Sequence, residues 1–192
     1  MKLLHIDSSA LGAESVTREL SAAIAVRWLD AVPGLTVDYR NLDTDPLPHL
    51  SGGSLAQADP DEAAEAERVL AQFLAADVVV IGAPMYNFAI PSTLKAWIDR
   101  VTVAGRTFHY TAAGPEGLAG GKRVIVASGR GGLHAGAVSD FVEPYLGFVF
   151  GFMGIQDVEF VRAEGVAYSP QHRADAIAGA LAAIPEPLLE AA

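Results

Sequence analysis

The chain has 192 residues, 51% of them hydrophobic, and its 13 Lys and Arg against 23 Asp and Glu give a net charge of −10. This length suits one domain, predicted over residues 1–192, and the hydrophobic fraction excludes a disordered chain. The acidic charge argues against nucleic acid as a partner, and the absence of cysteine excludes disulfides, thiolate metal ligands and cysteine nucleophiles.

Strands and helices alternate along the first part of the chain. The short apolar run Lys2–Asp7 predicts a buried strand. Residues 15–30 are predicted as a helix because apolar side chains recur there at four-residue spacing, at Val16, Leu20, Ile24 and Trp28. A strand is expected at 35–40, where three side chains alternate with polar neighbours: Leu35, Val37 and Tyr39. Residues 41–59, rich in Pro, Gly, Ser and Asp, are expected to form a loop.

The second part of the chain continues the alternation. The β-branched run at 77–83 predicts a central strand that is buried on both faces, as in a parallel sheet covered by helices. Further strands are expected at 123–128 and 155–161. The remaining helices are expected at 61–76, 91–103, 139–150 and 171–184.

Five strands joined by helical crossovers predict an α/β fold, with a doubly wound five-stranded parallel sheet and helices on both faces. In such sheets a ligand binds beyond the carboxyl ends of the strands, near the point where the strand order reverses. That rule selects three loops that follow predicted strands, at residues 8–17, 84–90 and 128–134.

The first of these loops leads directly into a helix. The start of a helix offers unpaired backbone N–H groups, which together with the helix dipole favour an anion such as phosphate. The hydroxyls of Ser9, Ser15 and Thr17 add donors without positive charge. Neither a dinucleotide-binding glycine motif nor a P-loop is present. The alternative is that Ser15 only caps the helix.

The second loop places two aromatic residues and a methionine between a buried strand and a helix start. Met85, Tyr86 and Phe88 can form a wall for a flat conjugated ring, with Asn87 and backbone amides at its polar edge. The alternative for the two aromatic side chains is ordinary packing in the core.

The third loop combines glycines with an arginine and a histidine. Gly129, Gly131 and Gly132 allow the backbone to approach a ligand closely. Arg130 can contact a phosphate or make a structural salt bridge. His134 is either a surface histidine or, beside a cofactor, a donor to developing negative charge. No paired-carboxylate, metal-ligand or hydrolase motif is present, so no metal site is expected.

Together these loops resemble those of the FMN-dependent NADH:azo/quinone oxidoreductase (azoreductase) family. Residues 84–88, followed by Leu94 and Lys95, are similar to the flavin-loop signature of that family. The other segments that match it, in chain order, are 8–9, 15–17, 108–111, 114–118, 130–132 and 163–165. The resemblance covers nearly the whole chain. It implies a flavodoxin-like fold over residues 1–192, FMN as the cofactor, and a homodimer with two FMN sites near its interface.

The resemblance also implies roles for individual positions. The FMN phosphate is expected at Ser9, Ser15, Val16 and Thr17. The flavin ring is expected to be flanked by Met85, Tyr86, Asn87 and Phe88. Its pyrimidine end is expected at Gly129, Arg130, Gly131 and Gly132. An apolar wall for the substrate, partly supplied by the second subunit, is expected from Tyr110 and Phe152.

Two departures from the family pattern bear on the site. Gly129 stands where many relatives carry Ser, which removes one hydroxyl contact. The connection at 43–61 is shorter than in many members, and this loop can border the substrate pocket. The effect of both departures on activity and substrate preference therefore stays open.

The activity that the resemblance implies is the transfer of two electrons as hydride in a ping-pong cycle. NADH or NADPH passes hydride to the flavin N5, and a quinone or azo compound then accepts it. No side chain is assigned as catalytic, although His134 is a candidate for stabilising the reduced ring. The sequence leaves open the preferred nucleotide, the physiological acceptor and the residues that a second subunit supplies.

Other functions fit parts of the pattern. A flavodoxin-like carrier would pass single electrons between partner proteins, and a flavin reductase would use FMN as a diffusible substrate. A phosphodiesterase acting on acyl carrier protein is the least favoured, because the sequence offers no metal cluster or clear nucleophile. No membrane partner is expected, since the most apolar stretch, 146–155, is too short to span a bilayer. A cytoplasmic location is the default, because His5 and Asp7 interrupt any apolar signal-peptide region.

Overall fold

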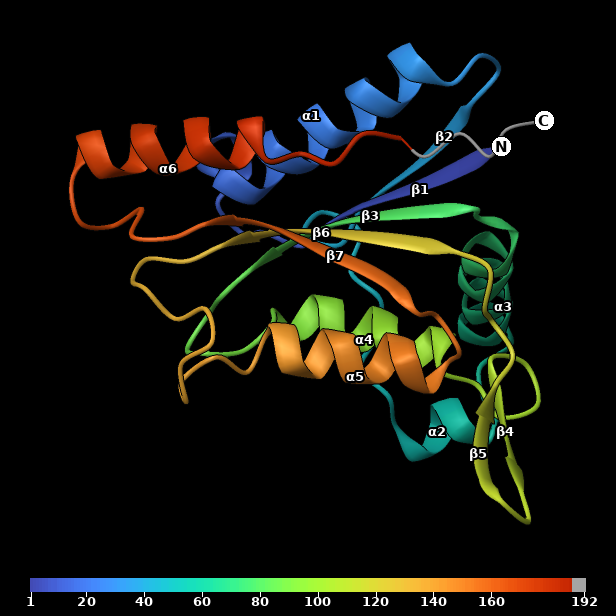
Figure 1. The fold of residues 1–192 in the computed structure, drawn as a ribbon. Helices are drawn as coiled ribbons and strands as arrows, with labels where there is room; N and C mark the ends of the chain where they lie inside the picture. Colours follow the sequence, from blue (N-terminus) through green and yellow to red (C-terminus); the bar gives the residue numbers. More distant parts are fainter. Residues whose placement is uncertain (188–192) are drawn as a thin grey trace.

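Five parallel strands form the central sheet, in the spatial order β2-β1-β3-β6-β7 (Figure 1). They are β1 (Lys2–Asp7), β2 (Thr36–Asn41), β3 (Val78–Pro84), β6 (Arg123–Gly129) and β7 (Asp157–Ala163). This computed structural model describes residues 1–187, so residues 188–192 of the predicted domain lie outside the described residues. The strand order reverses between β1 and β3, which confirms the predicted doubly wound α/β fold.

Helices cover both faces of the sheet (Figure 1). One face carries α1 (Val16–Ala31) and α6 (Pro170–Ala182). The other face carries α3 (Pro60–Ala75), α4 (Ser92–Val101) and α5 (Glu143–Phe152). The sheet therefore separates two apolar cores, one in each helical layer.

The central strand β3 belongs to both cores. All its residues are buried, and successive side chains point to opposite faces of the sheet. Val78 and Val80 lie in the core under α1 and α6, whereas Val79 and Ile81 lie in the core under the other helices. The unbroken β-branched run predicted this double burial, which is confirmed.

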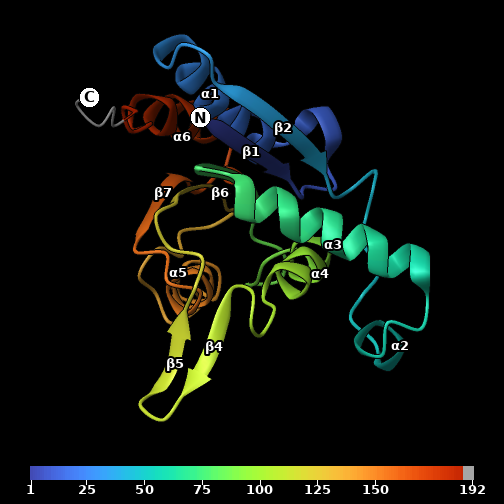
Figure 2. The ribbon, with the colours of Figure 1, turned by 90° about the vertical axis from the view of Figure 1, so that its right-hand side faces the viewer.

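A 3-10 helix at Gly12–Glu14, a short α-helix and a hairpin were not expected from the sequence. The helix α2 (Gly52–Leu55) lies within the predicted loop 41–59, where Ser51 and Ser54 cap it reciprocally. A hairpin of β4 (Phe108–Thr111) and β5 (Gly114–Gly117) forms a second, antiparallel sheet that projects from the body of the molecule (Figure 2). The prediction that 41–59 forms a loop is therefore wrong at Gly52–Leu55.

The helix predicted at 139–150 begins several residues later. The Asp140 carboxylate accepts hydrogen bonds from the backbone N–H groups of Val142 (3.0 Å) and Glu143 (3.2 Å), so a capped turn precedes α5. Pro144 then occupies the first helical turn, where a missing N–H does no harm. The strand predicted at 155–161 is also displaced, to Asp157–Ala163, so both sets of boundaries are wrong.

The alternation predicted for the strand at 35–40 holds for Leu35 and Val37, which pack in the core under α1 and α6, but it is wrong at the end of the strand. In the edge strand β2, Tyr39 has 54% of its surface exposed, whereas Arg40 is buried. Arg40 pairs with Glu65 of α3 at 3.0 Å, which lets a charged side chain take the inward position. The Tyr39 hydroxyl donates to the carboxylate of Asp7 on β1 at 2.9 Å.

The carboxyl ends of the three central strands lie at one edge of the sheet. Asp7 of β1 stands opposite Gly82 of β3, and Pro84 of β3 stands opposite Gly129 of β6. The loops that follow these strands therefore begin side by side, at the left-hand edge of the sheet in Figure 1. Within residues 1–187, no helix is long and apolar enough to cross a membrane, and no three His, Asp or Glu residues are grouped to hold a metal ion.

The projecting hairpin is seated by a contact between two glycine backbones. A Cβ on Gly117 would lie 2.1 Å from the backbone N of Gly154 and 2.3 Å from the carbonyl carbon of Met153. Gly154 has a φ of +90°, which other residues rarely adopt. The segment between α5 and β7 therefore fixes the hairpin only because both positions lack side chains.

Replacing Gly117 by Ala should lower the free energy of unfolding by about 1–3 kcal/mol, because the new methyl group meets backbone atoms that cannot give way. Chemical denaturation followed by circular dichroism measures this loss. Gly179→Ala is the matched control, since its methyl group on the exposed side of α6 meets nothing within 4 Å. That control should stabilise the helix by up to about 1 kcal/mol. Unchanged stability of Gly117→Ala would contradict the contact.

Candidate functional site

The loop after β1 gathers buried hydroxyl groups at the start of α1. Ser15 caps this helix, and its Oγ accepts a hydrogen bond from the backbone N–H of Arg18 at 3.2 Å. Thr17 Oγ1 lies 3.1 Å from Ser15 Oγ, and Ser9 is buried at the other end of the loop. The Val16 side chain belongs to the core, so its backbone N–H is what it can offer a ligand. Capping by Ser15 and an anion at the helix start are therefore compatible.

Tyr86 joins the first loop to the second. Its hydroxyl lies 3.1 Å from Ser9 Oγ and accepts a hydrogen bond from the backbone N–H of Ala10, also at 3.1 Å. Ser8 adds a second link, because its Oγ donates to the carbonyl of Gly82 in β3 at 2.7 Å. The two loops are thus held at a fixed distance. Tyr86 is only half-buried at the site edge, so core packing alone does not describe it.

The second loop ends in a tight and strained turn. Tyr86 and Ala89 exchange backbone hydrogen bonds of 2.9 Å and 3.1 Å, while Asn87 (φ +49°) and Phe88 (φ +72°) both occupy the left-handed region. Such a conformation is costly for a bulky residue, and it occurs most often at functional sites. The turn leaves the Phe88 ring 54% exposed, which excludes core packing as its role. Met85 precedes the turn and packs partly against the core.

The third loop is tied by its backbone to the segment after β7. Arg130, Gly131 and Gly132 each accept a hydrogen bond at their carbonyl oxygen from the backbone of residues 165–167, at 3.0–3.2 Å. The Glu164 carboxylate accepts two further bonds, from the backbone N–H groups of His134 (2.7 Å) and Ala135 (2.8 Å). These bonds fix the course of the glycine-rich backbone.

The Arg130 side chain lies entirely within the protein. It has no exposed surface, and it pairs with Asp140 (2.9 Å), Glu143 and Glu164 (3.4 Å). Arg162 binds Glu143 from the outside with two bonds of 2.7 Å. The salt-bridge alternative for Arg130 is thus confirmed, and only the backbone of this residue remains for a ligand. The same ion pairs connect the third loop to the start of α5.

Gly129 has a packing reason to lack a side chain. A Cβ at this position would lie 2.9 Å from the Thr17 methyl carbon, closer than real contacts allow. Thr17 is itself buried against β6, so it cannot easily move. A residue with a side chain here would therefore push against the hydroxyl-bearing start of α1.

His134 lies at the junction of the second and third loops. Its ring makes an edge-to-face contact with Phe88, with centroids 5.8 Å apart. Its Nδ1 lies 2.9 Å from the hydroxyl of Ser139. These contacts orient the ring beside the strained turn, so His134 is not an isolated surface histidine.

Tyr110 and Phe152 are not brought together with the three loops. Both lie around Phe108 of the hairpin, with ring centroids 5.5 Å and 4.6 Å from it, and Tyr110 is 75% exposed. The hairpin lies at the opposite end of the sheet from the loops in Figure 1. Within one chain, the predicted substrate wall and the predicted cofactor site are therefore separate.

Two charged groups beneath the first loop were not predicted from the sequence. The Asp7 carboxylate accepts hydrogen bonds from Ser21 (2.7 Å) and Tyr39 (2.9 Å), and Arg18 approaches it to 3.6 Å. Burial alone would raise the pKa of Asp7, but the nearby His5 ring and these hydrogen bonds outweigh it and hold the pKa below its ordinary value. Asp7 is thus ionised at neutral pH. The one signal in the sequence is an acidic residue that closes a buried strand.

Comparison with known proteins gives the family. A family model described as a flavodoxin-like fold matches residues 1–188. A protein of Xanthomonas axonopodis pv. citri named FMN-dependent NADH:quinone oxidoreductase 1 is 69% identical over 186 residues, which cover 97% of this chain and 96% of the relative. The chain belongs to the FMN-dependent NADH:quinone oxidoreductase family. A member from Bradyrhizobium diazoefficiens is 58% identical, with 95% of this chain and 96% of the relative covered.

Solved structures agree with this family. An azoreductase of Bacillus anthracis str. Sterne has a TM-score of 0.84 and 30% identity, with 95% of both chains covered. A FMN-dependent NADH-azoreductase of Bacillus anthracis str. Ames Ancestor, solved in complex with FMN, has a TM-score of 0.86 and 27% identity at the same coverage. The flavodoxin-like fold and the azoreductase resemblance predicted from the sequence are both confirmed.

Replacing Arg130 by Met should lower the free energy of unfolding by about 3–5 kcal/mol, because Asp140, Glu143 and Glu164 would lose their buried cation. Arg162→Met is the matched control: it removes a 44% exposed partner of the same Glu143, and should cost less than about 1 kcal/mol. Urea denaturation of both variants measures the difference. Equal losses in the free energy of unfolding would contradict the prediction that the buried Arg130 contributes more to stability than the exposed Arg162.

Proposed function

We propose that this chain binds FMN and catalyses the reduction of quinones, and of azo compounds, by NADH. The observation that carries the proposal is the meeting of three loops at the switch point of the sheet, where Tyr86 joins the hydroxyl-rich start of α1 to the strained turn at 86–89. A ligand that fits such an arrangement has an anionic group at one end and a flat ring at the other. FMN has this shape.

The donor set around the first loop fits the FMN phosphate. Ser9, Ser15 and Thr17 supply hydroxyls, and the start of α1 supplies backbone N–H groups and the positive end of its dipole. The net charge of −10 offers no general attraction for a dianion. Local hydroxyls and amides are therefore the groups that would hold the phosphate.

The second and third loops fit the flavin ring. The residues from Met85 to Phe88 would lie along one side of the ring, with the strained turn presenting the Asn87 and Phe88 backbone to it. The glycine-rich backbone of 129–132 would lie at its pyrimidine end, held in place by its bonds to residues 165–167. His134, in contact with Phe88, would donate toward the reduced ring.

The reaction balances without a side-chain acid. NADH, a proton and a quinone become NAD⁺ and a hydroquinone, and bound FMN supplies the chemistry that carries the two electrons between them. The chain would position first the nicotinamide and then the acceptor against the same face of the bound flavin. NADH is the proposed donor because the relatives are named for it.

A single-electron carrier is the alternative within this fold. The names of the relatives favour the reductase, since those from Xanthomonas axonopodis pv. citri and Bradyrhizobium diazoefficiens are both named FMN-dependent NADH:quinone oxidoreductases. The two functions differ in a simple way: a reductase oxidises free NADH by itself, whereas a carrier needs partner proteins on both sides.

The purified protein should be yellow, and it should oxidise NADH with a soluble quinone in ping-pong kinetics, giving parallel lines in double-reciprocal plots. This pattern follows because one site accepts the two substrates in turn. Omitting the quinone under anaerobic conditions is the control, and it should stop turnover after one NADH per flavin. Protein that cannot be loaded with FMN, or that oxidises NADH only with a partner protein, would overturn the proposal.

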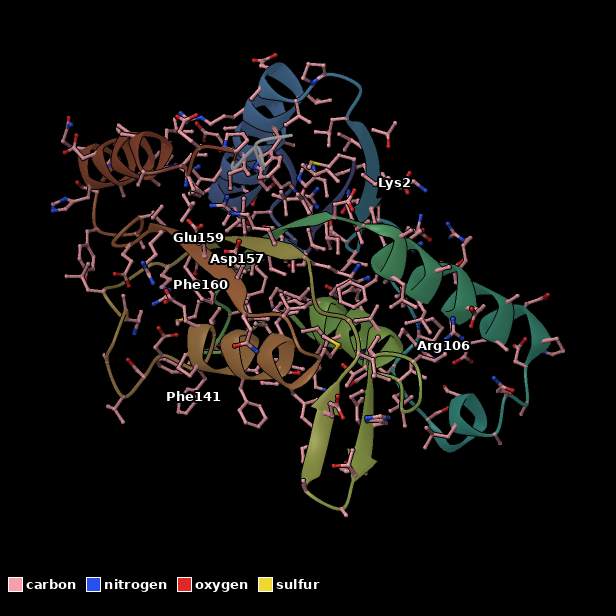
Figure 3. All side chains as sticks on the ribbon, turned by 45° about the vertical axis from the view of Figure 1, so that its right-hand side comes forward. Lys2, Arg106, Phe141, Asp157, Glu159 and Phe160 are labelled. Atoms are coloured by element: carbon pink, nitrogen blue, oxygen red, sulfur yellow. The ribbon has the colours of Figure 1, made fainter. Side chains whose placement is uncertain are left out.

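We further propose that the active form is a homodimer. Tyr110 and Phe152 lie away from the three loops of their own chain, so a second copy would have to bring them to the site. An apolar groove of about 490 Å³ lies beside the second loop, lined by Ile90, Phe141 and Tyr145 among others. Phe141 is 60% exposed on the outer surface by α5 (Figure 3). A location in the cytoplasm, where NADH is available, belongs to the same proposal.

Replacing Phe141 by Glu should convert the dimer to a monomer, because a charge would be buried in an apolar contact. Light scattering coupled to gel filtration measures the mass. Val26→Glu is the control, since Val26 is 54% exposed on α1 at the other face of the sheet and should leave the dimer intact. A monomeric mass for the unmodified chain at micromolar concentration would refute the dimer.

A further inference from the structure

An ionised carboxylate lies directly beneath the first loop. Asp7 is the last residue of β1, and the loop that carries Ser8 and Ser9 follows it. Its side chain is only 5% exposed, so water screens its charge weakly. A phosphate dianion bound at the start of α1 would therefore be repelled by the negative charge of Asp7. An anion site here requires that something offset Asp7.

Arg18 is placed to do so. It lies in the first turn of α1, and its Nη1 is 3.6 Å from Asp7 Oδ2 and 3.2 Å from the Tyr39 hydroxyl. Its Nη2 donates to the Asn41 side chain at 2.7 Å. The Arg18 side chain is 16% exposed, and thus mostly withdrawn from solvent. Its guanidinium faces Asp7 and the residues at the end of β2, where Asp43 Oδ2 lies 3.8 Å from Nη2. The His5 ring approaches the other carboxylate oxygen of Asp7 to 3.6 Å, but Arg18 is the neighbour that always carries a positive charge.

Arg18 also holds the backbone of the loop itself. Its Nη2 donates to the carbonyl oxygen of Ser9 at 2.8 Å. This bond ties the Ser9 end of the loop to the first turn of α1. The Ser9 hydroxyl is left to interact with Tyr86 and with a ligand.

We propose that Arg18 is a positioning residue that makes the first loop selective for a phosphorylated flavin over an unphosphorylated one. It does this by offsetting the buried Asp7 and by fixing Ser9 against α1, without being the side chain that the flavin ring contacts. This inference rests on the proposed FMN site. It concerns the chain's selectivity between FMN and riboflavin, which the activity alone does not reveal.

The test compares the affinities of the full chain, freed of flavin by dialysis, for FMN and for riboflavin, using quenching of flavin fluorescence. Arg18→Met should weaken FMN binding about tenfold or more and leave riboflavin binding within about twofold, since riboflavin has no phosphate. Arg18→Lys keeps the charge but loses the forked bonds to Ser9 and Asn41. Its loss of FMN affinity should therefore be smaller than that of Arg18→Met.

Arg100→Met is the matched control. Arg100 is likewise mostly withdrawn from solvent, and it binds one backbone carbonyl, that of Pro48 (2.8 Å), and one carboxylate, that of Glu62 (2.7 Å), but it lies on α4 at the other face of the sheet. Its loss should destabilise the fold without changing the ratio of the two flavin affinities. Thermal melts of all variants separate stability from selectivity.

The outcomes are distinct. A loss of affinity for FMN with unchanged affinity for riboflavin supports the proposal. If Arg18→Met does not fold, the same comparison of the two flavin affinities is made with Arg18→Lys. Equal losses for FMN and riboflavin, or no change in either, would overturn it and leave Arg18 a structural residue. Failure of the unmodified chain to bind either flavin would instead overturn the proposed FMN site.

Discussion

Parallel pairing of β1, β3 and β6 in register brings Asp7, Pro84 and Gly129 to the same edge of the sheet. The candidate site depends on these strand ends, because its three loops begin at adjacent points there. Side chains then connect the loops to one another. Tyr86 links the first loop to the second, the His134 ring contacts Phe88 of the second, and the Thr17 methyl group packs against the third. Without that register, no local feature of the loops would bring them together.

The second constraint is electrostatic. An acidic chain that is to hold an anion has few cations to spare, and at the strand ends it places two arginines against its own carboxylates. Arg130 is enclosed by Asp140, Glu143 and Glu164, and Arg18 lies between Asp7 and the Ser9 carbonyl. In both places a loop at the strand ends is shaped by an arginine that is mostly withdrawn from solvent, fully so for Arg130 and with 16% of its side chain exposed for Arg18. The donors left for a ligand are hydroxyls and backbone N–H groups, which are suited to an anion without attracting other polyanions.

The fold was predictable where burial imposes a regular pattern. The run in β3 is apolar at every position because helices cover both of its faces. Apolar side chains recur every four residues in α1 because only one face of that helix is buried. The hairpin and α2 were not predicted from the sequence, because their strands and helix span only four residues each. The hairpin also depends on a distant contact, that of Gly117 with Gly154. The loops of the site were found from their place after strands. The burial of Arg130 and the part played by Arg18 were not, because their partners lie 9 to 34 positions away and only the folded chain brings them together.

We propose that the three loops at one edge of the sheet form an FMN site with a phosphate end and a ring end. A crystal structure of the protein loaded with FMN tests it most directly. We expect the phosphate at Ser9, Ser15 and Thr17, and the ring between the turn at Asn87 and Phe88 and the backbone of Gly131. Density for FMN at any other place, or a phosphate turned toward the third loop, would contradict it.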